Sequence, residues 1–241
     1  AGELLAIRGR VIPSTLSNIT LVGSTISGET LIGESRVGNS SDRLRSLTLI
    51  PANPAAHPEA VRAIEDADMV VIGPGSLFTS IVPNLLISDI SAALAGSPAF
   101  KVYVCNVAEE PAQTEGYSVL DHLNIVRHYG GESSIDAVLA NRNLPGGETP
   151  AGLDFIRANN PWEDDVILVE ADVIDETDNT STARHDPVKL SNAIAEAYRK
   201  YRGRRRRLPR VRLNLDLNRP GNGRPVLNGN GESKPLPVQE K

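Results

Sequence analysis

The chain has 241 residues, 40% of them hydrophobic, and a net charge of −5, so it is long enough for one domain with a buried core and a tail. Its single cysteine excludes an internal disulfide framework, and no stretch reaches the roughly 18 consecutive apolar residues of a membrane helix. The net charge conceals an asymmetry, because residues 1–198 carry 12 Lys and Arg against 27 Asp and Glu, whereas residues 199–241 carry 13 against 3. We therefore expect a cytoplasmic protein with an acidic body and a basic tail.

The first fifty residues predict β-strands. Asn18–Val22 and Glu29–Ser35 are rich in β-branched residues and flank a Ser-Gly turn at residues 27–28. Leu44–Ile50 alternates apolar and polar side chains, which is the pattern of a half-buried strand.

From residue 57 to residue 170, helical patterns alternate with short apolar strands. His57-Pro58-Glu59 opens the first helix, because proline suits the first turn. Met69–Ile72 is short and apolar, which is typical of a buried parallel strand. The alternation predicts a Rossmann-like α/β fold with a mainly parallel sheet and helices on both faces. The predicted helices are residues 57–66, 77–86, 88–95 and 119–129, and the predicted strands are residues 69–72, 102–107, 137–141 and 166–170.

The most informative local feature is the turn after the first of these apolar strands, Gly73-Pro74-Gly75-Ser76. A strand that ends in such a turn and leads into a helix exposes backbone N–H groups at the positive end of the helix dipole, which attracts phosphate. Gly75 allows the backbone to approach a ligand, and Ser76, Thr79 and Ser80 offer hydroxyl groups. The alternative is an ordinary βα turn in which glycine serves tight geometry only.

Ligands of open parallel sheets bind beyond the carboxyl ends of the strands. Here those ends carry the glycine-rich turn, then Asn106, then Asn141. The Asn106 amide can donate and accept hydrogen bonds toward a base, a sugar or an amide, and the alternative is that it caps a loop. We interpret Asn141 as a loop residue. The polar segment 109–116 follows the second apolar strand and is placed to fold over a ligand.

Arg184-His185-Asp186-Pro187 is the second informative motif. Asp186 is a good N-cap and Pro187 a good first helical residue, so a helix is predicted from there to about Tyr201. Neither role explains Arg184, whose guanidinium can bind phosphate or carboxylate in bidentate fashion. His185 either hydrogen-bonds the ligand or packs against the sheet.

No catalytic constellation stands out, so we predict no catalytic residue and no metal ligand. Cys105 lies in an apolar strand and is predicted to be a core residue. His122 is interpreted as a half-exposed helix residue. A solvated loop is predicted for the acids Asp172, Asp175, Glu176 and Asp178.

The chain is predicted to divide into a domain of residues 1–202 and a tail of residues 203–241. A dense basic block of arginines and one lysine extends from Arg199 to Arg212, and residues 218–241 are rich in Pro, Gly and Asn, so we expect the tail to be disordered. Such a block can bind a polyanion: RNA, DNA or anionic lipid. The alternatives are association with the acidic body or simple solvation.

Several strings together resemble the CofD-like family and, within it, the gluconeogenesis-factor (YvcK-type) branch. They are residues 8–15, 33–35, 72–86, 101–107, 113–118 and 184–187, which occur in the family's order and extend the resemblance over residues 1 to about 200. The transferase branch, which makes the phospholactyl side chain of coenzyme F420, has Ser-Asn where this chain has Gly75-Ser76. This difference favours the first branch.

The chain departs from the family in two places. Members begin with a strand, a Gly-Gly-Gly-Thr-Gly-type turn and an Asp-Gly-Gly segment, none of which occurs here. The chain thus resembles the middle and C-terminal part of the family, and we expect half of any nucleotide site to lie on missing sequence. Members usually carry Thr-Gln-Pro-Gly-Glu-Thr-Asp-Gly at 109–116, where this chain keeps Pro111, Thr114 and Gly116 but has Ala112 in place of glycine.

The resemblance implies a non-catalytic cytoplasmic regulator that binds a nucleotide sugar such as UDP-N-acetylglucosamine and links gluconeogenic carbon metabolism to cell-wall synthesis and cell shape. Beyond the UDP-sugar it implies no certain cofactor, and we expect a homo-oligomer, a dimer. The alternative is a 2-phospho-L-lactate transferase-like enzyme of coenzyme F420 biosynthesis, a phosphoryl-group transferase that uses Mg²⁺ and a deazaflavin acceptor. The predicted ligand-binding residues are Gly73, Pro74, Gly75, Ser76, Thr79, Ser80, Asn84, Asn106, Arg184 and His185.

Overall fold

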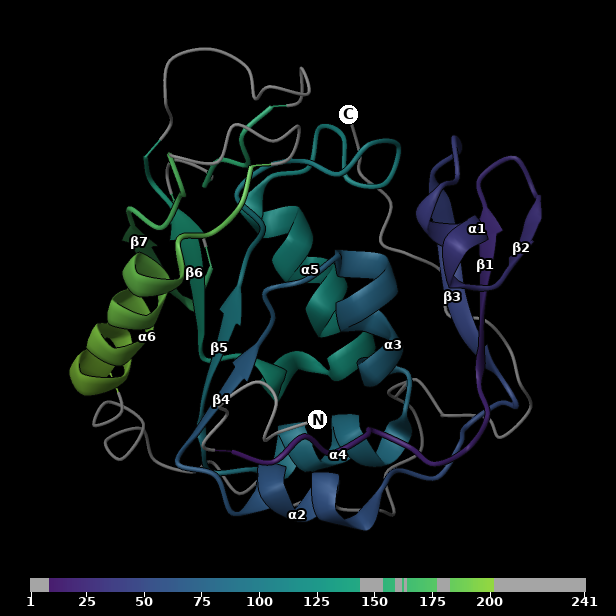
Figure 1. Ribbon diagram of the computed structural model, residues 1–241, viewed down its shortest axis with the longest axis horizontal. Coiled ribbons are helices and arrows are strands. Elements are labelled where there is room, and N and C mark those ends of the chain that lie inside the picture. Colours follow the sequence, from purple (N-terminus) through teal and green to yellow (C-terminus); the bar gives the residue numbers. More distant parts are fainter. Residues whose placement is uncertain (1–8, 144–153, 159–161, 163, 177–182, 202–241) are drawn as a thin grey trace, which may run out of the picture.

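The computed structural model describes residues 9–143, 154–158, 162, 164–176 and 183–201, which form two sheets flanked by helices (Figure 1). An antiparallel sheet of three strands comes first in the chain, and a parallel sheet of four strands follows. In chain order the elements are β1 (Thr20–Thr25), β2 (Thr30–Ile32), α1 (Glu34–Gly38), β3 (Leu44–Ile50), α2 (Pro58–Glu65), β4 (Met69–Ile72), the π-helix η1 (Leu77–Ile81), α3 (Val82–Leu85), α4 (Ser88–Gly96), β5 (Phe100–Val104), α5 (Val119–Gly130), the 3-10 helix η2 (Glu132–Ser134), β6 (Ala137–Asn141), β7 (Ile167–Ala171) and α6 (Pro187–Tyr201).

The parallel sheet has the strand order β4-β5-β6-β7, so neighbours in the sheet are also neighbours in sequence. Every residue of β5 is buried. Phe100 and Val102 pack in the cluster that includes α6, whereas Tyr103 and Cys105 pack in the cluster formed with α3, α4 and α5. Helices thus cover both faces of the sheet (Figure 1), and the expected Rossmann-like α/β fold is confirmed.

The antiparallel sheet, in the order β2-β1-β3, packs with α1 against η1 and α3. Gly23 in β1 allows α1 to pack closely on this sheet, because a Cβ there would lie 3.2 Å from side-chain atoms of both Val37 and Leu44. We call β1, β2, β3 and α1 the antiparallel unit.

The prediction of a strand over residues 29–35 was wrong at the C-terminal end of that range. The strand stops at Ile32, and α1 begins at Glu34. Gly33 separates the two with a φ of +96°, a left-handed backbone conformation that ends an extended strand.

Two further expectations change in detail. β5 begins at Phe100 and ends at Val104, whereas the prediction ran from Val102 to Val107. The helix expected at residues 77–86 is present, but it starts as the π-helix η1 before it continues as α3. The predicted helix at Pro187–Tyr201 has these bounds in the structure.

His122 was expected to be half-exposed, and this is wrong. The side chain is fully buried on α5, its ring stands edge-on to Tyr117 at 5.8 Å between centroids, and Nδ1 lies 2.9 Å from the carbonyl oxygen of Ser118. The pattern of α5 alone did not reveal that the loop before the helix covers this side chain.

The predicted disordered tail at 203–241 and the acid Asp178 lie outside the described residues. Across the described ranges, no single helix has the length and apolar character needed to cross a membrane. Only the bent pair Leu77–Leu85 and Ser88–Gly96, taken together, meets that test of length and composition.

The loop between β5 and α5 contains a strained alanine. Ala112 has a φ of +58°, the left-handed region that L-residues other than glycine rarely adopt. This observation gives a physical reason for the glycine in the family motif quoted above.

We expect Ala112→Gly to stabilise the protein by about 0.5–1 kcal/mol. The left-handed backbone costs an alanine about 1–2 kcal/mol, and the greater unfolded-state entropy of glycine offsets part of the gain. Urea unfolding measures the change. The matched control is Ala92→Gly, at an exposed position within α4, which should destabilise by roughly 0.5–1 kcal/mol. Equal destabilisation by both substitutions would contradict the strain at Ala112.

We also expect stability to fall in mild acid because of His122. Burial lowers the pKa of this imidazole below its usual 6.5, and the smaller effect of Asp121 opposes the shift. The unfolded chain therefore binds a proton at a higher pH than the folded chain does, so the free energy of unfolding decreases as the pH falls through 6.5. Urea titrations at about pH 7.5 and about pH 5 should show a smaller difference for His122→Leu than for the unaltered protein. An unchanged difference would assign the pH dependence to other groups.

Candidate functional site

The turn Gly73–Ser76 follows β4 at the carboxyl edge of the parallel sheet, beside the end of β5. Gly73 has a φ of +88°, and a Cβ there would lie 3.2 Å from the carbonyl oxygen of Val104. Gly75 is confined from the other side, since its Cβ would lie 3.0 Å from the Cβ of Ser80. Packing within the fold therefore accounts for both glycines, and the capacity of the turn to bind a ligand depends on the donors at its end.

An internal anion already occupies those donors. Oε2 of Glu110, in the loop after β5, accepts hydrogen bonds from the hydroxyl of Ser76 at 3.1 Å and from the N–H of Leu77 at 3.3 Å. Burial raises the pKa of Glu110, and these two bonds act in the opposite direction. The sequence predicted that this loop folds over the site, but Glu110 was not among the predicted site residues. The signal that could have identified it was an acidic residue in a loop predicted to fold onto unpaired N–H groups.

The loop that carries Glu110 connects the two sheets. The N–H of Glu110 donates to Oγ1 of Thr114 at 2.8 Å, which closes a tight turn. The buried Gln113 donates to the carbonyl oxygen of Gly38 at 3.0 Å, and Arg43 donates to a carbonyl oxygen of the same loop at 3.0 Å. Gly38 and Arg43 lie in or next to the antiparallel unit, so that unit helps to position Glu110.

The segment before α6 reaches the same edge of the sheet. His185 pairs with Ile174 in an antiparallel bridge, and its Nε2 donates to the carbonyl oxygen of Cys105 at 3.2 Å. Cys105 directly precedes Asn106, so this bond brings two predicted site residues together. Burial lowers the pKa of His185, which is therefore neutral near pH 7 with its proton on Nε2. Arg184, the next residue toward the N-terminus, is exposed at this edge.

The predicted residues on η1 and α3 make other contacts. A Cβ on Gly38 would lie 3.5 Å from the methyl carbon of Thr79, so Thr79 faces α1. Asn84 donates to the carbonyl oxygen of Ser80 at 2.7 Å and accepts from the hydroxyl of Ser14. Ser80 and Asn84 are both exposed. Ligand contact by any of the ten predicted residues stays a prediction.

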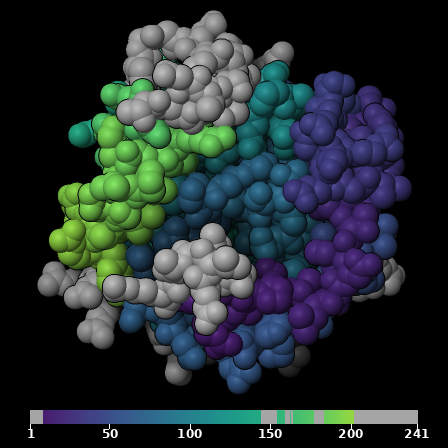
Figure 2. Space-filling view, in the orientation of Figure 1, coloured from purple at the N-terminus to yellow at the C-terminus, as the bar shows by residue number. Residues whose placement is uncertain are grey.

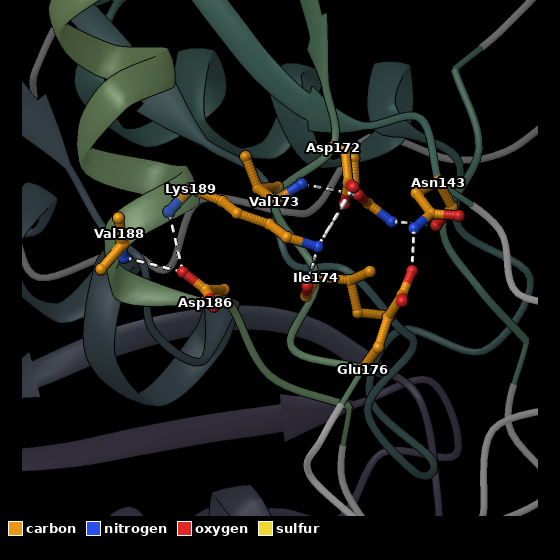
Figure 3. A network of polar contacts seen from close by, with 9 residues as sticks. Asn143, Asp172, Val173, Ile174, Glu176, Asp186, Val188 and Lys189 are labelled. Atoms are coloured by element: carbon orange, nitrogen blue, oxygen red, sulfur yellow. Dashed lines mark hydrogen bonds and ion pairs between the residues drawn. The ribbon is translucent and has the colours of Figure 1, made fainter.

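Polar contacts at the start of α6 hold this edge in place (Figure 3). Oδ1 of Asp186 accepts from the N–H groups of Val188 and Lys189, both at 2.8 Å, which confirms the expected N-cap. The ammonium group of Lys189 lies 3.1 Å from the Asp172 carboxylate and 3.1 Å from the carbonyl oxygen of Ile174.

The acids after β7 were expected to form a solvated loop, and Asp172 and Glu176 lie in the loop that follows β7, partly exposed and exposed respectively. Asp172 pairs there with the lysine of α6, and Glu176 accepts from Asn143 (Figure 3). Asn141, expected in a loop, is the buried last residue of β6 and accepts a main-chain N–H from the segment after β7 at 3.1 Å. Within the described ranges, no group of three or more His, Cys, Asp or Glu side chains is placed to hold a metal ion.

The front face of the molecule is hollowed between α6 and the antiparallel unit (Figure 2). The floor of this hollow has the blue of β4 and the turn that follows it. A different hollow, of about 430 Å³, lies between α2 and α4, where its lining includes Val61, Asp89 and Ala93. That hollow is at the opposite end of the sheet from the carboxyl ends of the strands (Figure 1), so volume alone does not locate the candidate site.

Comparisons with known proteins identify the family of the chain. The family model described as 2-phospho-L-lactate transferase CofD matches residues 1–177. The chain is 38% identical over 209 residues to a Nostoc protein carrying the gluconeogenesis-factor name, which covers 82% of this chain and 45% of that protein. It is 36% identical over 139 residues to the gluconeogenesis factor of Bacillus subtilis, and this match covers 58% of this chain and 44% of the relative.

A crystal structure of a Bacillus halodurans protein of the UPF0052 family superposes with a TM-score of 0.73 at 31% identity, and covers 80% of this chain and 64% of that one. The chain spans only 45% and 44% of the lengths of the two curated relatives named above.

We expect Asp186→Ala to lower the free energy of unfolding by about 1 kcal/mol, because it leaves two N–H groups of α6 without their cap. Asp186→Asn is the matched control, since asparagine caps a helix about as well as aspartate does. Thermal or urea unfolding separates the two variants. Equal losses for both would show that the carboxylate charge, and not the cap, is what stabilises the helix.

Proposed function

Because the chain belongs to the CofD family and is similar to its gluconeogenesis factors, we propose that it is a non-catalytic regulator that binds UDP-N-acetylglucosamine. Binding of this nucleotide sugar links gluconeogenic carbon metabolism to cell-wall synthesis and cell shape, in the cytoplasm. The homo-dimer and the polyanion contact of the basic tail expected from the sequence are part of the same proposal.

The observation that carries the proposal is the convergence of two donors on one anionic oxygen at the end of β4. The Ser76 hydroxyl and the Leu77 N–H both reach Oε2 of Glu110, so this turn binds an anion in the protein itself. A diphosphate oxygen is an acceptor of the same charge. Arg184 is exposed at the same edge and offers a guanidinium for the second phosphate, and Asn106 offers an amide for the base or the sugar.

The second candidate is a phosphoryl-group transferase, which the description of the matching family model favours. Such an enzyme would take Mg²⁺ and a deazaflavin acceptor. The described acids fit a Mg²⁺ site poorly, because Glu110, Asp172 and Glu176 are each engaged by protein donors. The Gly75-Ser76 sequence also differs from the Ser-Asn of the transferase branch, so we place this candidate second.

Calorimetry with UDP-N-acetylglucosamine, GDP and a deazaflavin tests the choice. We expect heat of binding with the UDP-sugar and none with the deazaflavin. Binding of the deazaflavin alone, with product formed from a phospholactyl donor, would overturn the regulator and support the transferase.

We expect Arg184→Ala to weaken UDP-sugar binding by on the order of 1.5–3 kcal/mol, the range for a hydrogen bond to a charged group, with little change in thermal stability. Arg142→Ala is the matched control, because it removes an exposed arginine just after β6 and tests for a general effect of charge. Asp186→Ala should do the reverse of Arg184→Ala and affect stability more than binding. A loss of stability without a loss of affinity in Arg184→Ala would make Arg184 a structural residue.

A further inference from the structure

We propose that Glu110 is an internal competitor of the ligand phosphate, so that a phosphate oxygen binds the Ser76 hydroxyl and the Leu77 N–H only when the carboxylate leaves them. The inference rests on the proposed function, because it concerns how the same site is regulated. It assigns to Glu110 a part that none of the sequence motifs suggested.

The geometry of the contact with Glu110 supports this competition. Both donors reach the same oxygen, Oε2, at 3.1 and 3.3 Å. Leu77 is fully buried, and its N–H is the first of η1, so no preceding helical turn supplies it with a carbonyl partner. A buried N–H group needs an acceptor, and the carboxylate of Glu110 supplies it while the site holds no ligand.

The contact of Glu110 with the two donors places a carboxyl group where burial disfavours its charge. Glu110 is half-buried, and burial raises its pKa. Burial raises the pKa of Tyr103, a fully buried residue on β5, and the charge of Glu110 adds a smaller effect in the same direction. Burial thus disfavours the charged form of the Glu110 carboxyl group, and the bonds from Ser76 and Leu77 offset part of that effect. A diphosphate that adds contacts to Arg184 can replace the carboxylate, because exchange of one anion for another keeps both donors satisfied.

The hydrogen bonds of the loop leave the Glu110 side chain able to move. The turn that carries Glu110 is closed by its own bonds, from the N–H of Glu110 to Thr114 at 2.8 Å and from the N–H of Thr114 back to the carbonyl oxygen of Glu110 at 3.0 Å. The buried Gln113 fixes this turn to Gly38. The side chain of Glu110 can therefore rotate away from Ser76 while the turn keeps its place, so release of the donors does not require unfolding of the loop.

The test is calorimetry on the protein in its full length with two probes, inorganic pyrophosphate and UDP-N-acetylglucosamine. Glu110→Ala removes the competing carboxylate, and we expect it to tighten binding of both probes on the order of tenfold, the equivalent of one charged hydrogen bond. Glu110→Gln keeps a neutral acceptor and should tighten binding less.

Glu109→Gln is the matched control. It removes the same charge from the adjacent position, and its amide oxygen can still accept the N–H of Gly116, which Glu109 accepts at 2.7 Å. Its affinity for both probes should equal that of the unaltered protein. Tightening as large as in Glu110→Ala would assign the effect to net charge and overturn the competitor.

The outcomes separate this inference from the proposed function. If the UDP-sugar binds the unaltered protein but Glu110→Ala binds neither probe more tightly, the role of Glu110 as a competitor is overturned and the proposed regulatory function stands. If only pyrophosphate binds, and more tightly to Glu110→Ala, the role of Glu110 as a competitor stands and the proposed regulatory function is overturned. If neither probe binds any variant, both are overturned.

Hydrogen exchange supplies a readout that needs no ligand. Without the carboxylate acceptor, the Leu77 amide should exchange faster in Glu110→Ala than in Glu109→Gln. Unchanged exchange at Leu77 would show that Glu110 does not hold this donor and would overturn the competitor. Glu110→Gln, which retains an acceptor, keeps the calorimetric test available if Glu110→Ala does not fold.

Discussion

The parallel pairing of β4 and β5 is the constraint on which the candidate site depends. Because the two strands run in one direction, the turn after β4 and Asn106 after β5 emerge at the same edge. The register pairs Ile72 with Tyr103, so Gly73 lies against Val104, where only a glycine fits. A shift of one residue would separate the turn from this position and would also move the side chains of β5 to the opposite face of the sheet.

The two explanations offered for the glycine-rich turn address different parts of it. The glycines are required by steric packing against Val104 and Ser80, as the simpler explanation held. The donors at the end of the turn are the hydroxyl of Ser76 and the N–H of Leu77, and both bond to the side chain of Glu110 from another part of the chain. The glycines thus shape the backbone, and the residues after them provide the chemistry.

Features set by neighbours in the sequence could be predicted. The bounds of β3, β4, β6 and α6 follow from local periodicity, and the N-cap at Asp186 follows from a two-residue motif. Features set by distant residues could not. The contact of Glu110 with Ser76 spans 34 positions, and that of His185 with Cys105 spans 80, so local sequence patterns did not identify either pair. The burial of His122 likewise depends on how Tyr117 is folded over it.

The antiparallel unit contributes none of the ten predicted site residues, yet it affects the site through the loop after β5. Gln113 and Gly38 join that loop to α1, and Arg43 joins it to β3. The turn after β4 is fixed by close packing on two sides, whereas the loop is held by a few hydrogen bonds and contains the strained Ala112. A region with fewer packing contacts moves at lower free-energy cost. In the proposed competition, adjustment to an anion at this edge therefore falls to the Glu110 side chain, while the turn after β4 keeps the geometry that the sheet imposes.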